Sequence, residues 1–80
     1  MIIKPIATEK AIRLIEIENT LIFQVNSSDD KKNIKKDAEE LFKVKVEKVN
    51  IMNRGTKKVA YIKLDKAHQA IDVATKLGLI

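Results

Sequence analysis

The stretch Val49–Leu64, VNIMNRGTKKVAYIKL, decides the fold because it carries two strands and the turn that joins them. Apolar and polar residues alternate on both sides of Gly55, which is the pattern of strands that bury one face. Asn53 and Gly55 suit the turn, since asparagine and glycine reach positive φ at little cost. We therefore expect an antiparallel hairpin here.

The same turn concentrates positive charge, which a hairpin does not need for backbone reasons. On the returning strand, Ala60, Ile62 and Leu64 form the expected core face, so Tyr61 and Lys63 point the other way. Lysines on such a face can neutralise phosphates, and a tyrosine can stack on a base. An exposed strand tyrosine is also common without any function. The cations of this hairpin are Arg54, Lys57, Lys58 and Lys63.

The N-terminal half predicts two strands and two helices. A short strand is expected over Ile2–Ile6, because a residue before proline favours extended backbone. Thr8 should cap a helix that runs to about Ile15, and Leu21–Val25 alternates as a strand with one face in the core. A second helix should follow Asp29 and Asp30, with its inward face formed by Ile34, Ala38, Leu41 and Phe42.

The C-terminal half adds two features to the hairpin. Val44 and Val46 alternate on one parity and Val49 and Ile51 on the other, so a bulge or short loop should reset the phase near Glu47–Lys48. Asp65 is expected to cap a last helix that ends at Gly78, with Leu79 or Ile80 as its apolar contact. The inward face of this helix should be Ala67, Ala70, Ile71, Ala74 and Leu77.

This order of elements predicts a single domain over residues 1–80. Eighty residues are too few to support two hydrophobic cores. The strand patterns favour an α+β fold, a two-layer sandwich with a mostly antiparallel sheet of three to four strands and helices packed on one face. The other face of the sheet should meet solvent or a partner.

Composition narrows the possible partners. The chain has 16 Lys and Arg against 11 Asp and Glu, a formal charge of +5, which favours polyanions such as nucleic acid. Cysteine is absent, which excludes disulfides, thiolate nucleophiles and cysteine-based zinc sites. Charges interrupt every apolar run and no signal-peptide core is visible, so we expect a cytoplasmic protein without a membrane span.

Enzyme chemistry finds little support in the sequence. His68, expected in the first turn of the last helix, has no visible nucleophile as a partner. The adjacent pairs Asp29–Asp30 and Glu39–Glu40 would point to different faces and make no acid/base dyad. Two glycines cannot form a phosphate-cradling loop. We expect no catalysis, no cofactor, no metal and no small-molecule substrate.

The second helix carries a lysine cluster with two open interpretations. Cations near a helix N-terminus oppose the macrodipole, and pairs four residues apart repel by roughly 0.2–0.5 kcal/mol each. The cluster could bind phosphate, or it could be a solvated charged face that neighbouring acids offset. It comprises Lys31, Lys32, Lys35 and Lys36.

Three segments resemble the L23 family of large-subunit ribosomal proteins in its shorter archaeal form. They are KPIATEKAIRL at Lys4–Leu14, IKKDAEELFKVKVEKVN at Ile34–Asn50, and KKVAYIKL at Lys57–Leu64. The resemblance covers essentially the whole chain, including the final IDVATKLGLI. The chain departs from the family in three places: Val59 occupies a usually basic position, Ile51 replaces a frequent threonine, and the long hairpin extension of bacterial members is missing.

The resemblance implies a structural component of the large subunit that binds the third domain of large-subunit rRNA near the polypeptide exit tunnel. Its implied partners are neighbouring ribosomal proteins and factors that meet the nascent chain, including the signal recognition particle and, in bacteria, a ribosome-bound chaperone. The docking glutamate of the family falls on Glu9, which by itself is a first-turn acid able to pair with Arg13. The expected rRNA contacts are Lys4, Lys10, Arg13, Arg54, Lys57, Lys58, Tyr61 and Lys63.

Two other functions remain open at this point. A free single-strand RNA-binding module of similar architecture would need two or three aromatic residues on its open sheet face, and Phe23 is expected to be buried. A small protein-interaction module could use the basic face to meet an acidic protein.

Overall fold

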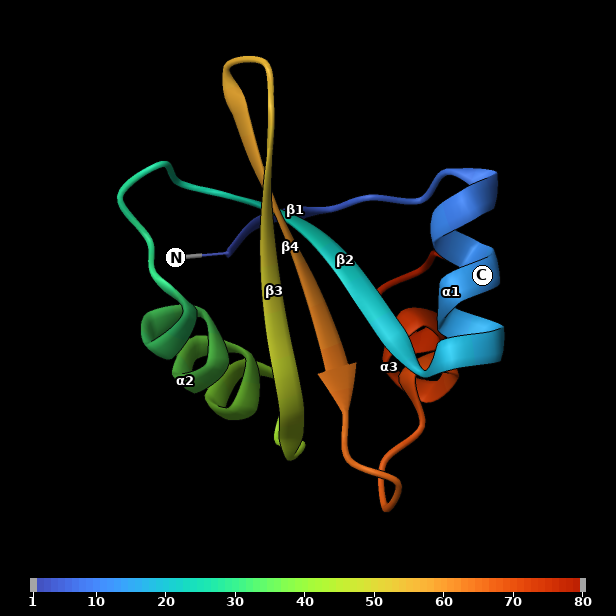
Figure 1. Cartoon of the computed structure of the whole chain (residues 1–80). Coiled ribbons are helices and arrows are strands. Elements are labelled where there is room, and N and C mark those ends of the chain that lie inside the picture. The colour runs from blue at the N-terminus through green and yellow to red at the C-terminus, as the bar shows by residue number, and fades with distance from the viewer. Residues whose placement is uncertain (1, 80) are drawn as a thin grey trace.

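The computed structural model describes residues 2–79 as an open, four-stranded antiparallel sheet with three helices (Figure 1). The strands lie in the order β1-β2-β4-β3 across the sheet. This arrangement confirms the α+β fold that the sequence predicts. The elements are β1 (Ile2–Pro5), α1 (Glu9–Glu18), β2 (Thr20–Val25), α2 (Lys31–Phe42), β3 (Val46–Arg54), β4 (Lys57–Leu64) and α3 (Ala70–Lys76).

The β3–β4 hairpin is confirmed, and its turn is tight. Arg54 lies opposite Lys57 in the register, so Gly55 and Thr56 alone form the turn. Gly55 has a φ of 64°, the left-handed backbone that a tight hairpin turn requires and that glycine adopts without strain. The tip of this hairpin extends beyond the other strands (Figure 1). The tip carries Arg54 and Lys57 on opposite strands.

A bulge at the start of β3 resets the alternation, which decides between the bulge and the short loop that the sequence left open. Val46 lies opposite Leu64 and Lys48 lies opposite Lys63, so Glu47 is the extra residue. Beyond the bulge Val49 returns to the core side of the sheet, opposite Ile62. The bulge thereby sends Lys48 to the face away from the core.

The main core lies between one face of the sheet and the helices α2 and α3. Strand β2 supplies Phe23, whose ring stacks on that of Phe42 with the two centroids 5.3 Å apart. The helices contribute small or branched side chains that are fully buried, which lets them approach the sheet closely. The other buried members include Leu21, Val25, Ile34, Ala38, Ala60, Ile62, Leu64, Ala70, Val73 and Ala74.

Helix α1 lies at the sheet edge and contributes to both faces. It is capped as predicted, since the Ala11 amide donates to Thr8 Oγ1 at 3.1 Å. Ile15 enters the main core, while Ala11 packs with Ile22 and Val59 in a second buried cluster on the other face. The prediction that β2 buries one face was therefore incomplete, because a helix at the edge can cover both sides. The helix also continues beyond Ile15 to Glu18.

Asn19 ends α1 and joins it to the chain before α3. Its φ of 54° is left-handed, a conformation that asparagine tolerates better than most residues. Its side-chain Nδ2 donates to the His68 carbonyl at 2.8 Å, and its Oδ1 accepts the Ala70 amide at 2.6 Å. Asn19 thus ends one helix with its backbone and holds the start of another with its side chain.

The start of α3 corrects the sequence prediction. Asp65 does not cap this helix: its Oδ1 accepts the Ala67 amide at 3.0 Å in the preceding turn, and α3 begins only at Ala70. Asn19, far away in the sequence, accepts the Ala70 amide instead. His68 consequently lies in the loop before α3, not in its first turn.

Four residues expected to face inward are exposed. Leu41 is 63% exposed because its neighbour Phe42 takes the inward position at the end of α2. Since α3 starts late, its buried face is Ala70, Val73 and Ala74, which leaves the other three at its margins. These three are Ala67, Ile71 and Leu77.

The end of α3 is confirmed as a Schellman motif. Gly78 has a φ of 77° and donates to the Thr75 carbonyl at 3.1 Å, while Leu79 donates to the Ala74 carbonyl at 2.9 Å. Leu79 packs against the main core. Ile80, the other expected contact, lies outside the described residues. None of the helices within residues 2–79 has the length and apolar character needed to cross a bilayer.

Candidate nucleic-acid interface

We call the side of the sheet that points away from α2 and α3 the outer face. Residues paired across neighbouring strands point to the same side of a sheet, so the register assigns each strand residue to a face. Lys4 pairs with Gln24, Gln24 with Val59, and Val59 with Met52, which forms one row across all four strands. The next rows are Ile22, Tyr61 and Asn50, then Thr20, Lys63 and Lys48, and finally Lys57 and Arg54 at the hairpin tip.

These rows give the outer face one sign of charge. Among the strand residues that the register places there, no side chain is acidic. All five cations are exposed to solvent. They are Lys4, Lys48, Arg54, Lys57 and Lys63.

Two pairs of these cations face each other directly. Lys48 lies opposite Lys63, and Arg54 lies opposite Lys57. Like charges in directly opposed positions destabilise an antiparallel pair of strands. An anionic partner that sits between them would turn this repulsion into attraction.

The start of α1 meets the outer face and forms a shallow hollow there, with a volume of about 80 Å³. Lys10 comes from the helix, while Arg54 and Tyr61 come from the hairpin. The buried side chains of Ala11, Ile22 and Val59 form an apolar floor. The hollow is completed by Ile6 and Thr8.

A hydrogen bond fixes the two hairpin residues of this hollow. Arg54 Nη2 donates to Tyr61 Oη at 3.1 Å. Because a guanidinium can only donate, the phenol acts as the acceptor and can still donate its own proton to another group. The Tyr61 ring is half-buried and packs against the cluster of Ala11, Ile22 and Val59. The bond places the guanidinium beside the phenol at the edge of the hollow.

Lys58 is placed apart from the other expected contacts. It shares the parity of Ala60 and Ile62, so it points to the core side of the sheet. Its Nζ donates to the Ser27 carbonyl at 3.1 Å and to the Asp29 carbonyl at 2.9 Å. The structure thus gives Lys58 a role in fastening the loop between β2 and α2.

Glu9 and Arg13 lie on another surface of α1. They line a separate, open hollow of about 430 Å³ together with Ile12, Glu16 and Ile17. Within the part of the chain that the structure describes, no ion pair joins Glu9 to Arg13, although their spacing would permit one. Ile17 is 74% exposed there. This hollow combines two isoleucine side chains with charges of both signs.

Sequence reasoning missed two polar members of the outer face. Lys48 lies opposite Lys63, and Asn50 lies opposite Tyr61. The phase reset near Glu47–Lys48 was the signal that could have found them, because residues after the bulge alternate with Val49 and Ile51. Of the predicted contacts, the structure brings Lys4, Lys10, Arg54, Lys57, Tyr61 and Lys63 to this side.

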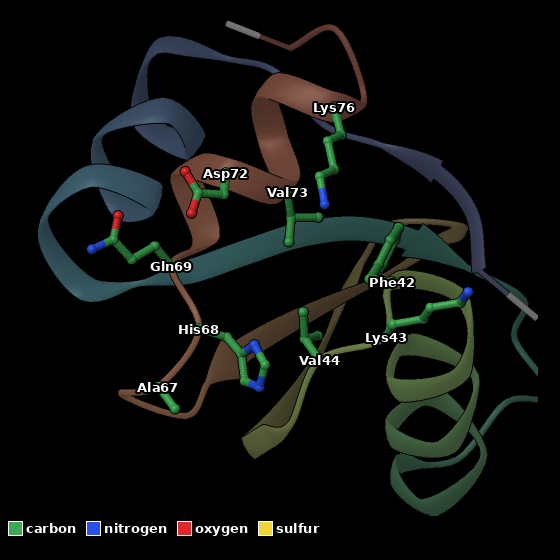
Figure 2. A pocket seen from close by; sticks show the side chains of 9 residues that line it. All are labelled: Phe42, Lys43, Val44, Ala67, His68, Gln69, Asp72, Val73 and Lys76. Carbon is green, nitrogen blue, oxygen red and sulfur yellow. The ribbon is translucent and has the colours of Figure 1, made fainter.

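A further hollow opens between α2 and α3, on the side opposite the outer face (Figure 2). Phe42, Val44 and Val73 line it together with the imidazole of His68. Its lining includes no serine, threonine or cysteine, so no hydroxyl or thiol nucleophile lies beside His68 in this hollow. No group of three or more potential metal ligands occurs within residues 2–79.

Comparisons with known proteins identify the same family as the three segments quoted from the sequence. The family model described as Ribosomal protein L23 matches residues 1–73. Large ribosomal subunit protein uL23 of Methanothermobacter thermautotrophicus is 49% identical over 81 aligned positions, which cover 99% of this chain and 93% of that protein. Large ribosomal subunit protein uL23 of Pyrobaculum aerophilum is also 49% identical, over 82 positions that cover both chains completely.

Proposed function

The chain belongs to the L23 family of ribosomal proteins, and from this premise we propose that its outer face binds large-subunit rRNA. Membership makes the chain a structural component of the large ribosomal subunit in the cytoplasm. The family consists of structural proteins rather than enzymes. The family predicted from the three quoted segments is thereby confirmed.

The observation that carries the proposal is the row of cations at the register-paired positions of the outer face; Glu47, the extra residue of the bulge, is an exposed acid of β3 that the register assigns to neither face. Five exposed cations share this face with no acidic strand residue among those in the described register. A lysine that contacts a phosphate releases a counterion, so each contact adds affinity that decreases with salt. The two directly opposed cation pairs are hard to explain by solubility alone, because they cost stability in the free chain.

Different residues of the face would serve different parts of the RNA. Lys4, Lys57 and Lys63 would neutralise phosphates and set the position of the protein on the RNA backbone. Arg54 and Tyr61 would add planar groups that can pack on a base or donate to a phosphate. Lys48, which lies opposite Lys63 on the outer face, would also neutralise a phosphate. Arg13 would be a peripheral contact on the far side of α1.

The position near the exit tunnel and the docking of the signal recognition particle at Glu9 are also part of the proposal. Glu9 is exposed, and its hollow includes the exposed side chain of Ile17, which suits contact with another protein. The Glu9 hollow shares no lining residue with the hollow beside Lys10. RNA on the outer face and a partner at Glu9 could therefore be bound together by one domain spanning residues 1–80.

A free single-strand RNA-binding module receives less support. Such a module needs several aromatic rings on its open face. Phe23 is buried and stacks on Phe42 inside the main core, so Tyr61 is the one ring available to the outer face. If the chain were instead a protein-interaction module, an acidic protein would have to neutralise the opposed cation pairs.

A pair of matched double variants tests the proposal. Lys57→Ala with Lys63→Ala should weaken binding to a folded large-subunit rRNA fragment and lower the salt slope by about two, because two phosphate contacts are lost. Lys35→Ala with Lys36→Ala removes the same charge from exposed positions on α2 and should change the slope much less. Equal effects of the two double variants would show either that only net charge matters or that the α2 lysines also contact the RNA, and both results would overturn the assignment of binding to the outer face.

A further inference from the structure

The hollow at the start of α1 supports more than contact with the RNA backbone. We propose that it seats one unpaired base of the bound rRNA, with the base packed on the apolar floor beside Tyr61. This inference rests on the RNA-binding function proposed above and specifies the part of the nucleotide that the hollow takes. Its position joins the first turn of α1 to the hairpin, far apart in the sequence.

The size of the hollow fits a single ring system. Its volume is about 80 Å³. Since one water needs about 10–15 Å³ of such space, the hollow holds roughly five to eight waters. Pockets for small metabolites are typically about 300–1,000 Å³, so a free metabolite would remain mostly exposed here. A base held by the rest of its RNA chain needs no such enclosure.

The lining fits a base better than a phosphate. Ala11, Ile22 and Val59 form a floor with no hydrogen-bonding side chain, and a phosphate placed against it would lose hydration without a replacement. The flat face of a base is suited to such a floor and to the ring of Tyr61. The polar groups stand at the rim, where the phosphates on either side of the base would lie. They belong to Lys10, Arg54 and Tyr61.

The bond between Arg54 and Tyr61 prepares the rim for this ligand. At 3.1 Å it holds the guanidinium beside the phenol, so less side-chain freedom is lost when RNA binds. The phenolic proton remains available to an acceptor on the base or on a phosphate. A base inside a duplex is stacked between its neighbours, so the base in question must come from a bulge, a loop or a flipped position.

The composition of the chain provides a direct measurement. Tyr61 is the single tyrosine, and tryptophan is absent, so the intrinsic fluorescence of the protein comes from the edge of this hollow. We would titrate the wild-type chain with the folded third domain of large-subunit rRNA. N-acetyl-tyrosinamide in the same RNA would correct for absorption by the nucleic acid. Stacking of a base beside Tyr61 should strongly quench the fluorescence as the complex forms.

Variants then separate stacking from charge. Tyr61→Leu keeps an apolar side chain but removes the ring, and should weaken binding about tenfold or more. Tyr61→Phe keeps the ring and should lose less. The matched control is Lys57→Ala, which lies on the outer face but does not line the hollow: it should bind more weakly yet show the same quenching at saturation.

The outcomes distinguish the inference from the function on which it rests. Tight binding with unchanged fluorescence, or with Tyr61→Leu equal to wild type, would overturn the base site and leave an interface that contacts phosphates only. Failure of the wild-type chain to prefer the folded RNA over a homopolymer would overturn the proposed function, and the base site with it. Thermal unfolding of each variant would show whether loss of binding reflects loss of fold. The quenching measurement uses the wild-type chain and therefore tests the base site even if a variant fails to fold.

Discussion

Lys48 and Lys63 lie directly opposite each other on the outer face, at the end of the hairpin farthest from its turn. Glu47, the extra residue of the bulge, shifts the alternation of β3 and so places Lys48 there. Without that shift the lysine would point to the core side. The bulge therefore creates a cation pair that costs stability in the free chain and favours an anionic ligand.

Lys48→Glu should separate stability from binding. The substitution places an acid opposite Lys63, and we expect the free energy of unfolding to rise by about 0.2–1 kcal/mol. Binding to the folded rRNA fragment should weaken at the same time, because a phosphate contact is replaced by a repulsive charge. Urea unfolding and an RNA titration measure the two effects. Lys66→Glu, on an exposed loop residue outside the sheet, is the control for net charge. Equal loss of RNA affinity in both variants would contradict the assigned role of Lys48.

Lys57 and Lys58 are neighbours with opposite expected phenotypes. Lys58→Ala should lower the free energy of unfolding by about 1 kcal/mol, since it removes the donor to the carbonyls of Ser27 and Asp29. Lys57→Ala should not lower the free energy of unfolding and should raise it slightly, because it removes the repulsion with Arg54, while it weakens RNA binding. Chemical denaturation and the RNA titration, applied to both variants, give the comparison. A result in which Lys58→Ala weakens RNA binding as much as Lys57→Ala, with no loss of stability, would contradict the structural role assigned to Lys58.

Asn19→Ala should be among the more destabilising polar substitutions in the chain. It removes the hydrogen bonds to His68 and Ala70 and places alanine at a φ of 54°, so we expect a loss of about 1–3 kcal/mol. Urea unfolding of Asn19→Ala and of Asn53→Ala, an exposed asparagine on β3, measures the difference. Similar stabilities of the two variants would show that the joint between α1 and α3 contributes little.

Local signals predicted the elements whose ends are determined nearby. The hairpin followed from Gly55 and the alternation around it, and the Schellman end of α3 followed from Gly78. The bulge near Glu47 followed from a change of parity between neighbouring valines. The hairpin turn and the helix end have their partners within a few residues in the sequence, and the change of parity is visible in neighbouring residues even though the bulge pairs with Lys63 and Leu64.

Distant partners explain what the sequence did not show. Asp65 looked like a cap for α3, but the first amide of that helix is accepted by Asn19, which no local pattern connects to it. The second buried cluster depends on α1 lying along the sheet edge, a consequence of β1 being short. For the same reason the sequence showed Lys10, Arg54 and Tyr61 only as separate candidates. The fold is what brings them to one hollow.

The most direct test of the central claim is a binding titration of the purified chain at several salt concentrations, against a folded large-subunit rRNA fragment and a single-stranded homopolymer. The outer face should bind the folded fragment tightly and keep a clear preference for it in the presence of competitor, with a salt slope that reflects several phosphate contacts. Equal and steeply salt-dependent binding to both RNAs would contradict the claim, because it would reduce the outer face to nonspecific attraction of a basic surface.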